Sequence, residues 1–198
     1  MNSRINALLI GFAATLTLTW VEAADKNNSP RAEARSLSLQ ALARGQSITS
    51  NKQQYQILDG VRAAESLSKE VPQQTLTRMG GSKMLETKGR FVVFTTAQGL
   101  ASVTSVNGTS YPTALNSRTG VIGILPGTLS IKLKGNADAA ALSNDYGLEL
   151  VRHFAHLQTA FYRVKTGRDV VAAAASLNAD IRVERAEVEV IEHMNVPH

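Results

Sequence analysis

The chain has 198 residues, enough for one ordinary domain or two small ones, and 43% of them are hydrophobic, which suffices for a core. The lack of cysteine excludes disulfides, thiolate zinc sites and a cysteine nucleophile. The formal net charge of +5 comes from basic residues that are thinly spread and lack an aromatic stacking motif. We therefore expect no nucleic-acid partner.

The first 23 residues have the features of a secretory signal peptide. Arg4 precedes an apolar run from about Ala7 to Trp20, and Val21-Glu22-Ala23 places small residues at the two positions that a signal peptidase reads. The run is shorter than the roughly 20 residues that span a bilayer, so we expect no membrane anchor after cleavage. The sequence predicts cleavage after Ala23 and a periplasmic or secreted mature protein.

Residues 24–82 are polar and rich in Ser, Gln, Asn and Ala, a composition that predicts a loosely ordered spacer. A first helix is signalled by Ser29, with Gly45 as its stop. A second short helix is expected within 55–71 and is broken by Pro72.

Residues 83–127 predict a small β-rich extension. They contain four short runs of β-forming residues, at 83–87, 90–96, 100–106 and 120–125. Asn107-Gly108 is a good signal for a hairpin turn, and Tyr111–Gly120 is expected to be a loop. Because roughly 45 residues bury little surface, we expect the extension to have little stability alone.

Four strands are expected in residues 128–198. The first alternates apolar and polar residues, and its apolar set is Leu129, Ile131 and Leu133. The second and third cover 148–158 and 159–165. The last begins at Ile181, with Glu187 and Glu189 outward and an inward set of Ala186, Val188 and Val190.

Two helices are expected between these strands. Asn136 caps the first, which Gly147 ends. The second begins at Gly167, ends at Asn178 and has the apolar stripe Val170, Val171, Ala174 and Leu177. The order β-α-β-β-α-β places both helices on one face of a four-stranded antiparallel sheet. We therefore predict an α+β protein with a ferredoxin-like domain at 128–198, whose other sheet face is bare.

No set of side chains predicts an active site. His153 and His156 lie three residues apart, so on a strand they point to opposite faces, and no carboxylate has a helpful spacing. The sequence has no serine nucleophile elbow and no phosphate-binding glycine loop. We expect a protein that is not an enzyme and that has no metal and no cofactor.

Two short motifs resemble those of a known family. Gly167-Arg168-Asp169-Val170 begins the second helix, and Val183, Glu184, Ala186 and Glu187 lie on the final strand. These motifs, and the pattern of residues 127–192 as a whole, resemble the propeptides of subtilisin-like serine proteases. The full layout is similar to the external chaperones of kexin-like secreted subtilases in Gram-negative bacteria, in which a propeptide-like domain is a separate protein.

The resemblance implies a secreted, kexin-like subtilisin-like protease as the partner. A propeptide lays its bare sheet face, here with Phe161 and Arg163, on two surface helices of the protease. Outward carboxylates, here Glu187 and Glu189, accept hydrogen bonds from the N-termini of those helices. The residues after the final strand enter the protease cleft as an added strand, here Ile191, Glu192, His193, Met194, Asn195, Val196, Pro197 and His198.

The tail departs from the propeptide pattern. Spacing from Glu189 puts the propeptide cleavage point near Asn195, yet the chain runs on to His198 and has no dibasic pair there. The resemblance predicts an exported, non-enzymatic chaperone and inhibitor of a subtilase. Two alternatives stay open: a protease inhibitor with no folding role, and a ferredoxin-like envelope protein that senses or binds a small ligand.

Overall fold

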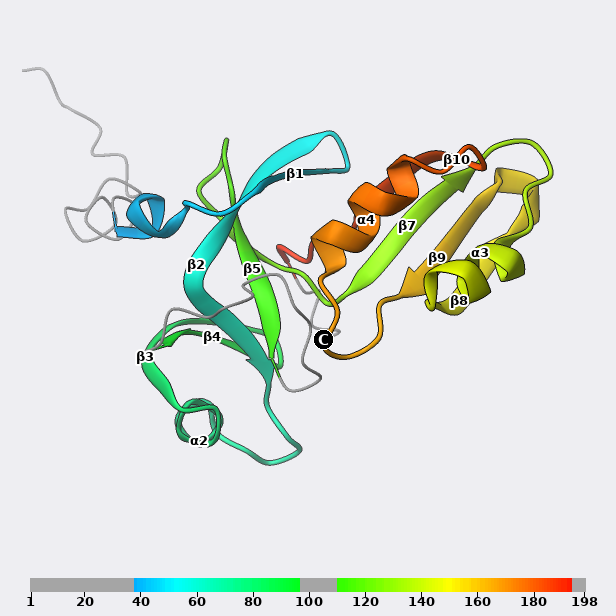
Figure 1. Ribbon diagram of the computed structural model, residues 1–198. Coiled ribbons are helices and arrows are strands. Elements are labelled where there is room, and N and C mark those ends of the chain that lie inside the picture. Colours follow the sequence, from blue (N-terminus) through cyan, green and yellow to red (C-terminus); the bar gives the residue numbers. More distant parts are fainter. Residues whose placement is uncertain (1–37, 97–109, 194–198) are drawn as a thin grey trace, which may run out of the picture.

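The computed structural model describes residues 38–96 and 110–193, which form a mixed α+β structure with two antiparallel sheets (Figure 1). The expected signal peptide at 1–23, the expected turn at Asn107-Gly108 and the tail residues 194–198 lie outside the described residues. None of the helices in the described ranges combines the length and the apolar character that a membrane crossing needs.

The N-terminal sheet has six strands arranged around β2 (Gln53–Glu65). Its strand order is β3-β4-β2-β5-β6, with β1 also paired to β2 and with every pairing antiparallel. The other strands are β1 (Ser47–Ser50), β3 (Gly81–Lys88), β4 (Phe91–Thr96), β5 (Tyr111–Asn116) and β6 (Ile122–Ile124). Strands β3 and β6 are therefore the two ends of this strand order.

Two expectations for this region are wrong. The helix expected within 55–71 is largely the strand β2, whose residues pair with β4 on one side and β5 on the other. The loop expected at Tyr111–Gly120 is the strand β5 as far as Asn116, and it lies buried between β2 and β6. In both segments, pairing with distant strands outweighs local composition. Residues 47–65 of the expected spacer are thus strands of this sheet.

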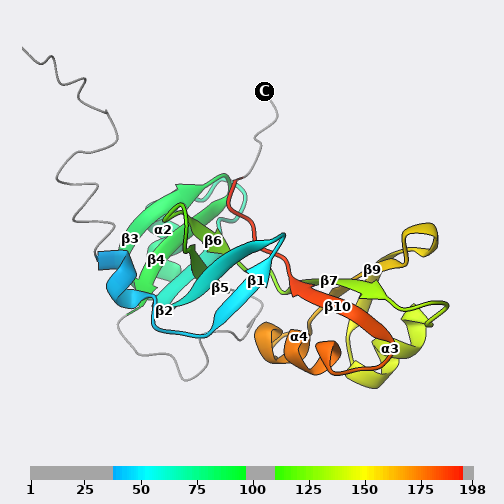
Figure 2. The same ribbon diagram turned by 90° about the horizontal axis from the view of Figure 1, so that it is seen from above.

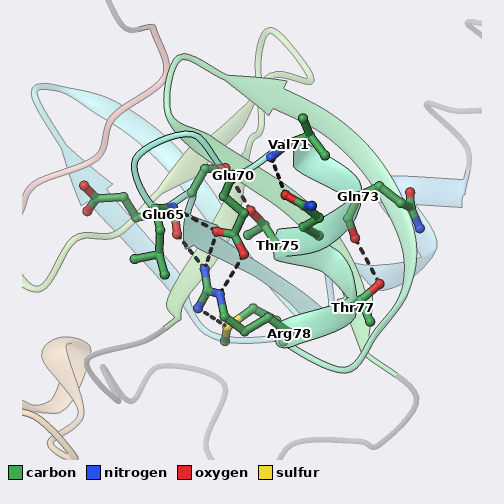
Figure 3. A network of polar contacts seen from close by, with 11 residues as sticks. Glu65, Glu70, Val71, Gln73, Thr75, Thr77 and Arg78 are labelled. Carbon is green, nitrogen blue, oxygen red and sulfur yellow. Dashed lines mark hydrogen bonds and ion pairs between the residues drawn. The ribbon is translucent and has the colours of Figure 1, made fainter.

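Pro72 begins a helix rather than ending one. It occupies the first turn of α2 (Pro72–Arg78), where its missing N–H leaves no hydrogen bond unmade. Glu70 accepts hydrogen bonds from Leu67 N–H at 2.8 Å and from the Arg78 guanidinium at 2.9 and 3.0 Å (Figure 3). Arg78 also donates to the Glu65 carbonyl at 2.9 Å, which ties α2 to the end of β2.

The C-terminal sheet has four strands and two helices in the chain order β7, α3, β8, β9, α4, β10. The strand order is β10-β7-β9-β8, and each pairing is antiparallel. The bounds are β7 (Thr128–Leu133), α3 (Ala139–Tyr146), β8 (Glu149–Phe154), β9 (Thr159–Arg163), α4 (Val170–Asn178) and β10 (Val183–Val188). A 3-10 turn at Ala155–Leu157 joins β8 to β9.

The helix ends agree with the sequence in part. Gly147 ends α3 in the left-handed conformation, with φ of 61°, as expected. The residue that caps α3 is Asp138 and not Asn136, because the Asp138 carboxylate accepts the N–H two residues on at 2.8 Å. The cap of α4 is likewise Asp169, so this helix begins after Gly167.

One hydrophobic core joins the two sheets. The inward sets predicted for β7, β10 and the α4 stripe are confirmed as buried, with Val190 half-buried: Leu129, Ile131, Leu133, Ala186, Val188, Val170, Val171, Ala174 and Leu177. The N-terminal sheet and its flanking chain add Ile48, Tyr55, Ile57, Ala114 and Leu125 to the same cluster. The two sheets therefore stabilise each other.

Candidate functional site

The C-terminal sheet has one face under α3 and α4; on the other, which we call the open face, no helix of residues 38–96 or 110–193 lies (Figure 2). Leu129, Ile131 and Tyr162 point toward the helices and are fully buried. Ser130 and Phe161 are their neighbours along β7 and β9, so they point to the open face.

Two rows of residues cross the open face. Residues directly opposite each other on β10, β7, β9 and β8 share a face. The first row is Glu187, Ser130, Phe161 and Arg152. The second row is Thr128, Arg163 and Glu149. Glu189 extends the second row, since its N–H donates to the Thr128 carbonyl at 2.9 Å. The structure thus brings Phe161, Arg163, Glu187 and Glu189 onto one face.

An aromatic pair lies on the open face at β8 and β9. Phe154 and Phe161 meet edge to face with ring centres 6.0 Å apart, and the Arg152 guanidinium lies 5.6 Å from the Phe154 ring centre. Both rings are half-buried, although none of the helices in the described part of the chain covers them. Arg152 and Phe154 escape prediction because a bulge between Leu150 and Arg152 breaks the strict alternation from which faces are assigned.

The carboxylates of the open face are partly shielded. The Glu187 side chain is 16% exposed and lies 3.4 Å from the Arg185 guanidinium. Burial raises the pKa of the Glu189 carboxyl. A hydrogen-bond donor supplied from outside would favour the charged form of Glu189 and lower this pKa again. Across the sheet, Arg163 lies 3.5 Å from Glu149.

The chain after β10 crosses to the N-terminal sheet (Figure 2). Ile191 forms an antiparallel bridge with Ile124 of β6, through N–H to carbonyl hydrogen bonds of 2.9 Å in both directions. Asn116 donates to the Glu192 carboxylate at 2.6 Å, and Lys88 donates to the Glu192 carbonyl at 2.9 Å. The first residues of the predicted cleft tail therefore lie against the protein's own sheet.

Of the other predicted tail residues, the structure describes His193. His193 is exposed, with its ring nitrogen 4.0 Å from the Glu192 carboxylate. Met194, Asn195, Val196, Pro197 and His198 lie outside the described residues. His153 and His156 are both exposed, and nowhere in 38–96 or 110–193 do three His, Asp or Glu side chains gather as they would around a metal.

Comparison with known proteins gives one family and one solved structure. The family model described as "Open reading frame 2 N-terminal domain" matches residues 26–197. The structure is described as the crystal structure of Aeromonas sobria serine protease (ASP) and the chaperone (ORF2) complex. The similarity has 23% identity, covers 47% of this chain and 96% of that chain, and has a TM-score of 0.35, too low to support a conclusion about the fold. No curated protein matches the chain.

Proposed function

The chain belongs to the open reading frame 2 N-terminal domain family, and from this premise we propose that it is an exported chaperone and inhibitor of a subtilisin-like secreted serine protease. The single observation that carries the proposal is the open face, where cross-strand pairing groups Phe161, Arg163, Glu187 and Glu189. These residues are the ones that the propeptide resemblance assigns to docking.

The docking step uses the open face of a ferredoxin-like domain. Phe154 and Phe161 supply half-buried apolar surface that a partner helix can complete, and Arg152 lies at its edge. Aromatic residues, including Phe, and Arg are enriched in protein–protein interfaces.

The two acidic residues orient the partner. Glu187 and Glu189 accept hydrogen bonds from the unpaired N–H groups at the N-termini of two protease helices, where the helix dipole favours a negative charge. Each such contact contributes about 0.3–2 kcal/mol. The raised pKa of Glu189 fits this role, since a carboxyl that is desolvated in the free protein gains most from a new donor.

The chain beyond β10 supplies the inhibitory contact. Ile191 and Glu192 lie against the N-terminal sheet, so the tail residues that follow them add an extended strand to the edge of the protease cleft, with the cleavage point of the propeptide pattern near Asn195. Because the domain is already docked, this second contact is intramolecular and gains affinity from a high effective concentration. The protein performs no chemistry of its own. During folding of the protease, the open face holds the two partner helices in their native arrangement.

The test is a refolding experiment. A denatured subtilase that lacks its own propeptide is diluted from denaturant with and without this protein, and peptide hydrolysis is followed after the complex is dissociated. The proposal expects recovery of activity only with the protein present, and inhibition of the native enzyme. Inhibition without recovery would favour an inhibitor with no folding role. Neither effect would favour the envelope ligand-binding alternative.

A further inference from the structure

The segment Val190–Glu192, which we call the tail root, contacts both ends of the N-terminal sheet. Ile191 is bridged to Ile124 on β6, and Glu192 accepts a hydrogen bond from Lys88 on β3. Ile191 also packs against the core cluster that contains Ile122 and Ile124. The tail root thus contacts both β6 and β3, which are the two ends of the sheet's strand order. Backbone, apolar and polar contacts together hold it there.

Gly123 makes room for the tail root. A Cβ atom at this position would lie 2.2 Å from Cγ1 of Val190, while its next neighbour, Tyr55, is 3.6 Å away. Gly123 is buried in β6, directly before Ile124, whose backbone forms the bridge to Ile191. A side chain at position 123 would therefore clash with Val190 and not with the rest of the sheet.

Asn116 is aimed at the tail root by its own turn. Its side-chain carbonyl accepts the N–H groups of Arg118 and Thr119 at 2.9 and 3.1 Å. This fixes the amide so that its NH2 group donates to the Glu192 carboxylate at 2.6 Å and also to Gln53. The contact joins residues 76 positions apart in the chain, and Lys88 reaches Glu192 from 104 positions away.

We propose that the N-terminal sheet is a clamp that fixes the point from which the tail leaves the molecule. Resting on the proposed function, this makes Asn116, Gly123 and Lys88 positioning residues for inhibition, because they act through the tail root. Releasing the clamp frees Val190–Glu192 and lengthens the link between the docked sheet and the cleft. Effective concentration falls with link length, so inhibition weakens by about tenfold while docking is kept.

The first test changes the charge that faces Glu192. Asn116→Asp keeps the carbonyl that holds the turn but replaces the donor by a second carboxylate oxygen. Hydrogen exchange in the free protein should then rise at the Ile191 and Ile124 amides. Adding Glu192→Gln lets the new side-chain amide at position 192 donate to the carboxylate at position 116. The Ile191 and Ile124 amides should then regain their protection from exchange. Any effect on Gln53 is common to the single and double variants, so the difference between them reports the contact with residue 192.

The second test uses the close approach at Gly123. Gly123→Ala should displace Val190 and raise the same exchange rates, and Val190→Ala in the same chain removes the clashing atom and should lower them again. Circular dichroism and the melting temperature check that each full-length variant is folded. If Asn116 and Gly123 merely stabilised the sheet, the second substitution would not restore protection from hydrogen exchange in both double variants.

Inhibition of a subtilase then decides the role. The clamp predicts about tenfold weaker inhibition for Asn116→Asp and Gly123→Ala, recovered in the two double variants, with unchanged binding of the domain. Equal or stronger inhibition by a variant whose tail root exchanges faster overturns the clamp alone. If the wild-type protein inhibits no subtilase although its Ile191 and Ile124 amides are protected from hydrogen exchange, both the proposed function and the clamp are wrong.

Discussion

The two sheets have similar antiparallel pairing but use their surfaces in opposite ways. The C-terminal sheet covers one face with α3 and α4 and leaves the other open, with Phe161 half-buried there. The N-terminal sheet instead engages its own chain, since β6 is bridged to Ile191. In the proposed function, the open face of the C-terminal sheet binds the protease, and the N-terminal sheet fixes the tail root. Changes in the first should alter binding, and changes in the second should alter inhibition.

The largest expected effect comes from the core that joins the sheets. Ile57 lies on β2 and is fully buried in the same cluster as Leu129 and Ile131. Ile57→Ala should lower the free energy of unfolding by about 2–5 kcal/mol. Denaturant unfolding followed by fluorescence and by circular dichroism should show one transition. Ile181→Ala, at a position 87% exposed, is the control and should change little. Two separate transitions would mean that the sheets are independent units.

The next effect tests the surface role of the open face. Phe161→Ala should weaken binding to the protease by about 2 kcal/mol, because a central aromatic side chain is lost from the interface. Stability should change much less, since Phe161 is only half-buried. Leu157→Ala is the matched control, as this apolar side chain is 53% exposed on the turn after β8. Titration calorimetry measures both, and equal affinities for the two variants would remove the open face from the interface.

A smaller effect is expected at the carboxylates. Glu187→Gln and Glu189→Gln together should weaken binding by about 0.3–2 kcal/mol for each lost charge at a helix N-terminus. Glu184→Gln, an exposed change on the same strand, is the control. The fold should stay intact. Unchanged affinity of the double variant at low salt would exclude these residues from capping partner helices.

The smallest effect concerns Glu70, which is neither on the open face nor among the residues that hold the tail root. Hydrogen bonds from Arg78 and Leu67 lower its pKa from 4.5 to about 2. A lowered pKa stabilises the fold above the unfolded-state value, and this contribution is lost as the pH falls toward 2. Glu70→Gln should therefore reduce the melting temperature slightly near pH 7, and the difference should shrink between about pH 4.5 and 2. A pH-independent difference would contradict the ion-pair account, and protease binding should not change.

The sequence predicted the C-terminal sheet better than the N-terminal one, for a physical reason. Its signals are local: alternation in Leu129, Ile131 and Leu133, a stripe on α4, and Gly147 at a helix end. By contrast, β2 and β5 owe their structure to pairing with distant strands, and their own residues favour a helix and a turn.

The candidate site shows the same limit. Alternation on β9 and β10 places Phe161 and Glu187 correctly on one face, but the bulge in β8 hides Arg152 and Phe154. The contacts of Glu192 with Asn116 and Lys88 have no local signal, since they join residues 76 and 104 positions apart. Only Gly123 leaves a trace in the sequence, as a glycine within an apolar strand.

The most direct test of the central claim is a truncation that leaves the tail root in place. The full-length protein and a variant lacking residues 194–198 are titrated against the partner subtilase, and both peptide hydrolysis and complex formation are measured. The account predicts that the truncated protein still binds through its open face but no longer blocks hydrolysis, because the tethered cleft contact is gone. Equal inhibition by both proteins would contradict it, since inhibition would then come from the docked domain alone.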